Sequence, residues 1–289
     1  MTNKNIIYYG FILSGLLLMV GCSSATNRQL INQGATITPA TESSYKLQSV
    51  PPPLSKVPAA VYQFRDQTGQ YKDKDNISSF STAVTQGATP ILMKALQDSN
   101  WFVMVEREGL QNLLTERKII RSAKAGQKTK VAIKALKPAR ILLEGGITGY
   151  DTNIRTGGKG AEYFGLSASK RYREDHVTVH LRAIDIDSGQ VLASVSTSKR
   201  LLSIEYRTGL FRYVKYKRLL ALEAGYTTNE PSHICVADAI EKAVHDLIIE
   251  GALKGVWKFK DPEAMYSPVI KNYKAEKSEL TVPLLKAAK

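Results

Sequence analysis

Cys22 is the residue whose surroundings point most clearly to a chemical modification. Lys4 supplies a positive charge near the start, an apolar run follows over residues 6–20, and the small residue Gly21 precedes the cysteine. This order is typical of a secretory signal peptide, and the apolar run is too short for a stable transmembrane helix. A cysteine at the first mature position can carry a diacylglycerol on its thiol and a further acyl chain on its new amine. We therefore predict a signal peptide over residues 1–21 and lipidation of Cys22.

The predicted acyl chains would hold the mature protein on a membrane. One chain binds a bilayer only marginally, at about 0.8 kcal/mol per buried methylene, whereas three chains bind almost irreversibly. The residue after the cysteine is Ser23 rather than an aspartate. This fits sorting to the outer membrane of a diderm bacterium, with the mature chain starting in the periplasm. The alternative is an ordinary signal peptide that is cleaved without acylation.

Other residue types that could support catalysis or metal binding are poorly placed for it. The sequence contains no Gly-x-x-x-x-Gly-Lys-Ser/Thr loop for nucleotide phosphates. Residues 185–189 begin like a calcium loop but lack its distal acidic residue, so a hairpin turn is favoured. His176 and His180 on one strand would stand about 13 Å apart, at roughly 3.3 Å per residue, too far to share a metal ion. Cys235, on an apolar helical face, is expected to be buried. We predict no enzymatic activity, no metal and no cofactor besides the acyl chains of Cys22.

The formal net charge of +14 raises the question of nucleic-acid binding. Basic residues are spread along the chain, with local clusters only at 170–173 and 212–218. A periplasmic lipoprotein also rarely meets nucleic acid, so we predict no such partner. We interpret the charge as a solvated or headgroup-facing surface, and the alternative is a field that steers an acidic client.

Helices and strands interleave along the mature chain, which predicts one mixed α/β (α+β) periplasmic domain. A polar, proline-containing segment at 22–58 is expected to be a tether. The domain would begin at 59, and helix periodicity starts at Ser81, interrupted by Pro90. The remaining predicted parts are the first part of the domain at 59–150, a β-hairpin at 174–198, a helical part at 218–261 and a loosely held tail at 262–289.

Residues 151–173 and 199–217 are too long to be simple loops of this domain, and both alternate between apolar and charged residues. Each forms a predicted hairpin with arms of about 9–11 residues, the length of a tilted membrane strand. A pair of hairpins covering the soluble domain is the alternative. The predicted lipid-facing residues are Phe164, Leu166, Leu202, Ile204 and Tyr206, and the predicted lumen-facing residues are Arg171, Arg173, Glu205, Arg207, Lys215 and Lys217.

Membrane strands would require the protein to oligomerise. Every backbone polar group must be paired in lipid, so a sheet with open edges is excluded there. Two hairpins per chain are too few, because the smallest known barrels need about eight strands. We therefore predict a homo-oligomer in which each copy contributes two amphipathic β-hairpins to one outer-membrane β-barrel.

Between residues 61 and 257 the chain contains a series of collinear motifs, namely Gln67–Gln70, Phe80–Val84, Ala95–Ser99, Glu108–Leu114, Glu116–Arg121, Tyr163–Gly165, Gly225–Thr227 and Asn229–Pro231. In these motifs the chain resembles the CsgG family of curli secretion channel lipoproteins. The resemblance implies a ninefold ring with a wide barrel above a periplasmic vestibule, which exports unfolded curli subunits without ATP. It also implies periplasmic capping and fibre-nucleation accessory proteins as partners.

The resemblance also implies a pore constriction formed by the loop at 66–80. In the family a Tyr, an Asn and a Phe form the collar. Here Phe80 matches the Phe, Ser79 stands where the Asn is expected, and the place of the Tyr falls on Lys74 or Asp75. The alternative for Phe80 is a residue that packs on the helix it precedes. The alternative for the whole chain is a non-channel periplasmic lipoprotein that binds an envelope partner protein.

Overall fold

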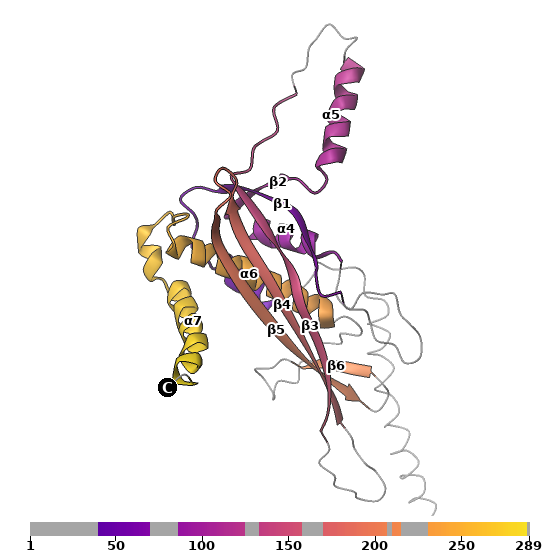
Figure 1. The fold of residues 1–289 in the computed structure, drawn as a ribbon, viewed down its shortest axis with the longest axis vertical. Coiled ribbons are helices and arrows are strands. Elements are labelled where there is room, and N and C mark those ends of the chain that lie inside the picture. The colour runs from indigo at the N-terminus through magenta and orange to yellow at the C-terminus, as the bar shows by residue number, and fades with distance from the viewer. Residues whose placement is uncertain are drawn as a thin grey trace, which may run out of the picture. The chain divides into compact units, whose positions relative to one another are not determined.

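A computed structural model describes the residues in the ranges 40–69, 86–124, 133–157, 170–206, 210–214 and 231–287. The strands are β1 (Val57–Asp66), β2 (Phe102–Glu106), β3 (Ile141–Gly157), β4 (Lys170–Asp185), β5 (Val191–Tyr206) and β6 (Leu210–Val214). They form a six-stranded mixed sheet with the order β2-β1-β3-β4-β5-β6 (Figure 1). β1 pairs in parallel with β2 and β3, and the later pairings are antiparallel. This arrangement confirms the predicted mixed α/β fold.

Helices cover one face of the sheet. Helix α6 packs on β4 and β5, while α4 packs on β1 and on α6, and α3 packs on α6 (Figure 1). Pro231 is the first residue of α6. The backbone N–H of a first helical residue has no partner within the helix, so a proline at this position costs no hydrogen bond. Most of α6 is buried on all sides because it lies between the sheet and other helices. The helices are α3 (Glu42–Gln48), α4 (Ala88–Asp98), α5 (Leu110–Lys124), α6 (Pro231–Leu253), the 3-10 helix η1 (Pro262–Tyr266) and α7 (Pro268–Ala287).

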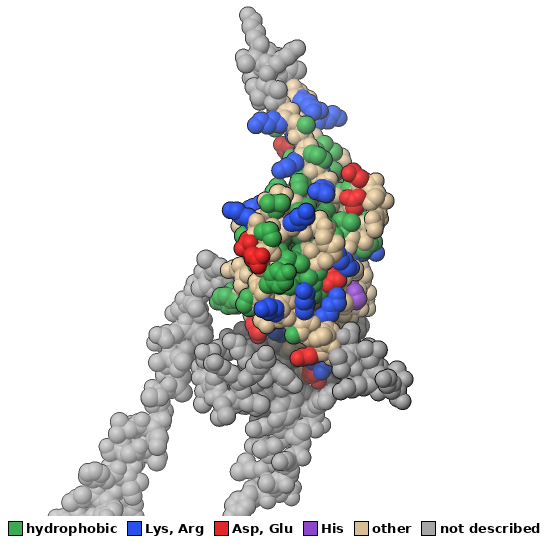
Figure 2. All heavy atoms as spheres, turned by 90° about the vertical axis from the view of Figure 1, so that its left-hand side faces the viewer, with side chains coloured by type: hydrophobic (Ala, Val, Ile, Leu, Met, Phe, Trp, Pro, Cys, Tyr) green, Lys and Arg blue, Asp and Glu red, His purple; other side chains and the backbone are tan. Residues whose placement is uncertain are grey.

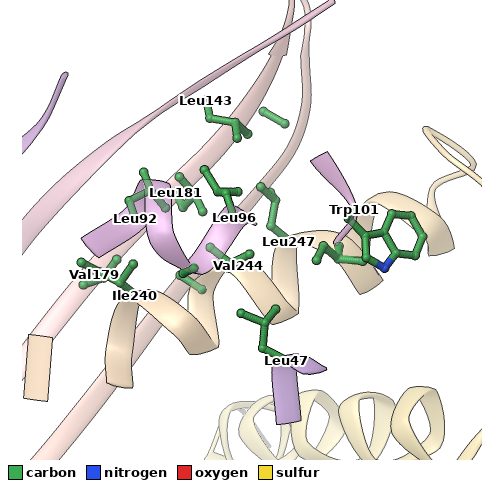
Figure 3. Packing of buried hydrophobic residues seen from close by; sticks show 14 of the residues in the cluster. Leu47, Leu92, Leu96, Trp101, Leu143, Val179, Leu181, Ile240, Val244 and Leu247 are labelled. Carbon is green, nitrogen blue, oxygen red and sulfur yellow. The ribbon is translucent and has the colours of Figure 1, made fainter. Parts of the chain in front are cut away.

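The hydrophobic core lies between the helices and the sheet. Figure 3 shows Leu92 and Leu96 of α4 beside Ile240 and Leu247 of α6, with Leu181 of β4 above them. All five side chains are essentially inaccessible to solvent. At about 25 cal/mol per Å² of apolar surface, burial of each such side chain stabilises the fold by roughly 1.5–3 kcal/mol.

The folded part extends further at both ends than the sequence predicts. Residues 42–58 were expected to belong to the tether, but α3 forms there, with Leu47 buried and Thr41 accepting a hydrogen bond from the Ser44 amide at 3.1 Å. The expected loose tail contains α7, whose Ile270 is buried. Both segments are held by few buried apolar anchors, which sequence periodicity does not reveal.

The helix expected from Ser81 begins later than predicted. The structure begins α4 at Ala88, after the non-helical Gln86 and Gly87, and the residues from 81 to 85 lie outside the described ranges. Pro90 therefore stands in the first turn of α4, where its ring meets no preceding helical carbonyl. Among the residues that the structure describes, no helix combines the length and the apolar character that crossing a bilayer requires.

Candidate functional site

Strands β3, β4 and β5 continue well past the end of their neighbour β1. The last pairing of β1 joins Asp66 to Ile147, and among the described residues β3 has no strand partner on that side beyond this point. The continuing parts form a four-stranded ribbon with β6, which leaves the domain at the lower end of Figure 1. We call this ribbon, made of 151–157, 170–175, 200–206 and 210–214, the strand extension.

Within the domain, the sheet has one apolar and one polar face. The row of β4 that faces α6 consists of the fully buried Val177, Val179, Leu181 and Ala183. The opposite row is polar and at least partly exposed, and its Arg182 forms an ion pair with Glu144 of β3 at 2.8 Å. This is the usual pattern of an antiparallel sheet that is covered by helices on one side.

In the strand extension the two faces exchange their polarity. The row that faces α6 continues into the directly paired positions Arg171↔Glu205 and Arg173↔Ser203. The opposite row continues into Tyr172↔Ile204 and Glu174↔Leu202, and then to Tyr206 of β5. Directly paired residues of neighbouring strands share a face, so Arg171, Arg173 and Glu205 follow the helix-covered side, while Tyr172, Leu202, Ile204 and Tyr206 follow the open side. At the base of the extension, Leu201 and Glu174 are exceptions on the two faces.

A cluster of buried polar groups lies where the polarity changes on the α6 side. Asp175 of β4 is fully buried, and its Oδ1 accepts a hydrogen bond from the Tyr150 hydroxyl at 3.2 Å. Lys199 of β5 forms an ion pair with Asp238 of α6, and Thr197 Oγ1 donates to the Ala239 carbonyl oxygen at 2.8 Å. These contacts tie the base of the strand extension to the first half of α6.

The electrostatics of this cluster favour a charged Asp238 and a neutral Cys235. Burial alone would raise the pKa of Asp238, but hydrogen bonds from Lys199 and from the Ser43 amide outweigh it and hold the pKa below its usual range. Burial, followed by the charge of Asp175, raises the pKa of the Cys235 thiol to about 12. Cys235 is buried, as predicted, and at neutral pH its thiol is protonated and therefore unreactive.

The outer strands of the extension do not follow the polarity exchange as cleanly. β3 enters it after a bulge between Ile147 and Gly149, and the resulting register pairs Arg155 with Tyr172 on the otherwise apolar face. In β6, Arg212 pairs with Ile204 on that same face. The polarity exchange is therefore a property of β4 and β5.

The described residues also include the first part of the loop at 66–80, as far as Gly69, and the chain from Gln86 onward. Asp66 Oδ1 accepts hydrogen bonds from the Thr68 amide at 2.9 Å and from its hydroxyl at 2.7 Å, while Oδ2 accepts one from Gln86 Nε2 at 3.3 Å. Gly69 has a φ of 65°, which side chains strongly disfavour. The Phe64 amide donates a hydrogen bond to Thr89 Oγ1, and the Thr89 hydroxyl donates one to the Phe64 carbonyl oxygen, each at 3.0 Å. These two bonds hold the first turn of α4 against the end of β1.

Many of the predicted site residues fall outside the described ranges. For Arg171, Arg173, Leu202, Ile204, Glu205 and Tyr206 the pairing register places the two predicted sets on opposite faces, in agreement with the period-two pattern. The sequence analysis missed the roles of Asp175, Lys199 and Asp238, although charged residues that interrupt the apolar rows of β4 and α6 were a visible signal. The residues outside the described ranges are Cys22, Lys74, Asp75, Ser79, Phe80, Phe164, Leu166, Arg207, Lys215 and Lys217.

Neither the face seen in Figure 2 nor the potential metal ligands among the described residues point to a second site. Figure 2 shows basic side chains scattered among apolar and other side chains over one face, which favours a solvated surface. Within the described part of the chain, no three His, Cys, Asp or Glu side chains are grouped so that they could hold a metal ion.

The fold and the site define a class of protein: a mixed α/β domain whose sheet continues into amphipathic strands. The family model for the curli production assembly/transport component CsgG matches residues 40–277. The chain belongs to the CsgG family, which confirms the resemblance seen in the sequence.

Named relatives agree with this assignment. The chain is 41% identical over 276 residues to the curli production assembly/transport component CsgG of Salmonella typhimurium, an alignment that covers 94% of this chain and 97% of the relative. It is 40% identical over 268 residues to the protein of the same name from Escherichia coli K12, with 91% and 96% covered.

Two solved structures show a much weaker likeness. A PelC dodecamer from Paraburkholderia phytofirmans is 12% identical, with 67% of this chain and 88% of that chain covered and a TM-score of 0.27. Protein XCC0632 from Xanthomonas campestris is 11% identical, with 77% and 90% covered and a TM-score of 0.24. TM-scores this low support no conclusion about fold or assembly.

Proposed function

We propose that this protein is an outer-membrane lipoprotein that forms an oligomeric channel and secretes unfolded curli subunits from the periplasm to the cell surface without ATP. The relatives' role as curli production assembly/transport components supports the curli part of this proposal. The exchange of face polarity along β4 and β5 is the observation that carries the channel part.

The polarity exchange is what a sheet needs when it passes from a domain into a bilayer. In the domain, the apolar row packs on α6 and the polar row meets water. In a membrane barrel, the outward row must be apolar and the inward row can be polar. Lipid would surround Leu202, Ile204 and Tyr206, together with Phe164 and Leu166. The water-filled lumen would be lined by Arg171, Arg173, Glu205, Arg207, Lys215 and Lys217.

Within the part of the chain that the structure describes, β3 and β6 form the two edges of the strand extension, and these edges support oligomerisation. An open edge in lipid leaves backbone groups unpaired, at several kcal/mol each. β3 and β6 run in opposite directions, so β6 of one copy can pair antiparallel with β3 of the next. A ring of roughly nine copies, which the family resemblance implies, would contain about 36 strands, a number that bacterial barrels reach.

The lipid anchor and the constriction complete the channel. Acyl chains on Cys22 would hold each copy at the outer membrane. A ring of Phe80 side chains, with Ser79 and either Lys74 or Asp75 beside it, would form the collar. Apolar constrictions gate partly by dewetting, so this collar would admit one extended chain and slow small solutes. The hydrogen bonds of Asp66 support the proposal because they hold the start of this loop and bring Gln86, which precedes α4, close to it.

The direction of export can come from chain entropy. An unfolded client confined in a vestibule closed by a capping protein has a raised free energy, since fixing backbone freedom costs about 1–2 kcal/mol per residue. The absence of a P-loop from the sequence is consistent with this source. If removal of the proton gradient alone abolished export in cells, the entropic explanation would be wrong.

The test is to purify the full lipidated protein from outer membranes and to measure its conductance in planar bilayers. Heat-resistant ring-sized oligomers and discrete conductance steps are expected, as is restored curli export in a strain that lacks its own channel. A monomer without conductance would instead favour a periplasmic lipoprotein that binds an envelope partner. Phe80→Ala should raise the conductance, and an unchanged current would refute the collar.

A further inference from the structure

We propose that Asp238 is a positioning residue that fixes the register of the strand extension relative to the periplasmic domain. This inference rests on the proposed channel function, because register matters most where one face must meet lipid. The side chain of Asp238 is only 5% exposed, and it forms an ion pair with Lys199, the residue of β5 paired with Val177.

Asp238 connects three elements that are distant in the sequence. Its carboxylate contacts Lys199 of β5 and accepts a hydrogen bond from the Ser43 amide, in the first turn of α3, at 3.0 Å. Close by on α6, Glu241 accepts a hydrogen bond from the Thr41 hydroxyl. One side chain of α6 therefore joins the helix that follows the lipid anchor to the strand that leads into the membrane.

Lys199 lies at the position where a register error would do the most damage. In the row of β5 that faces α6, Lys199 is followed by Leu201 and Ser203, which already belong to the strand extension. The side chain of Lys199 is 31% exposed. A slip of β5 by one residue would move every following side chain to the other face. Leu202 and Ile204 would then face the lumen, while Ser203 and Glu205 would face lipid.

The ion pair can prevent this slip because it exists in one register only. After a slip, the side chain at 199 would point away from α6, and Asp238 would be left buried without the ammonium. Buried ion pairs often add little net stability, because desolvation offsets their attraction, but in some proteins they select one arrangement over its alternatives. The expected role of Asp238 is selection of that kind.

The experiment compares Asp238→Asn, Lys199→Met and the double variant in the full lipidated protein. Asparagine keeps an acceptor for the Ser43 amide, and methionine keeps most of the apolar stem. Each single variant should lower both the melting temperature and the yield of heat-resistant rings. In the double variant neither member of the ion pair carries a charge, so the melting temperature should recover. The ring yield should nevertheless stay roughly tenfold below wild type, which corresponds to about 1.4 kcal/mol.

Asp246→Asn is the matched control, since Asp246 is a similarly buried carboxylate of the same helix. It pairs with Lys242 at 2.6 Å, on the side of α6 where Lys242 also pairs with Glu276 of α7. This variant should lose stability but keep its ring yield relative to folded protein. A double variant that assembles like wild type would overturn the role of Asp238. Failure of the wild type itself to form conducting rings would refute the channel, which is a separate outcome.

Discussion

The lipid-facing assignment of β5 can be tested by a lysine at Ile204. This position follows Arg200 by four residues, which at roughly 3.3 Å per residue and a tilt of about 40° places it about 10 Å deeper. Arg200 is charged and its side chain is 73% exposed, so it marks the aqueous side. A depth of about 10 Å is near the middle of an apolar band about 25 Å tall.

At that depth the cost of the lysine is large. A lysine on the lipid face near the midplane costs about 2–4 kcal/mol, and in a ring of roughly nine copies the total reaches about 18–36 kcal/mol. Ser203→Lys is the neighbouring control. It would face the lumen opposite Arg173, where repulsion between like charges is expected to cost only roughly 0.2–1 kcal/mol per copy, or about 2–9 kcal/mol for a ring of nine.

The assay is the yield of heat-resistant rings in outer-membrane fractions, followed by conductance. Ile204→Lys should abolish rings while the periplasmic domain still folds, as monitored by its protease-resistant core. Ser203→Lys should assemble and alter ion selectivity. Equal assembly of both variants, or loss of rings in Ser203→Lys alone, would refute the assignment of the two faces.

Three further predictions concern the anchor, the C-terminal helix and the sheet. Cys22→Ala should abolish acyl labelling of the mature chain, and continued labelling would exclude this site. Burial would raise the pKa of Glu250, but its bonds, led by the one from Lys277 at 2.8 Å, hold it below the ordinary 4.5. Glu250 therefore stabilises α7 above pH 4.5 and loses this effect as the pH falls through its folded-state pKa, which proteolysis of residues 262–287 would detect. Lys277→Met should raise the pH at which residues 262–287 become sensitive to proteolysis, and an unchanged pH dependence would contradict this role of Glu250. Gly145→Ala places a Cβ 2.0 Å from the His180 carbonyl oxygen, and denaturant melts should show a loss of about 1–3 kcal/mol or more.

Local patterns in the sequence were sufficient to predict most of the individual elements. The alternation at 176–186, the turn before Val191 and the helical stripe that begins at Pro231 were all recovered, because periodicity and turn residues act over a few positions. The docking of α3 and α7 was not predicted. Each depends on one or two buried anchors such as Leu47 and Ile270, whose burial is decided by distant parts of the chain.

The sequence by itself predicts lipidation at Cys22, and it determined the period-two alternation that separates Ile204 from Glu205. Only the tertiary structure decided which of these faces continues the helix-covered side of the domain. Which face continues the helix-covered side depends on the pairing register and on bulges, because one extra residue anywhere along a strand exchanges the two faces beyond it. The contact of Lys199 with Asp238 likewise required the fold, because it joins a strand to a helix far away in the chain.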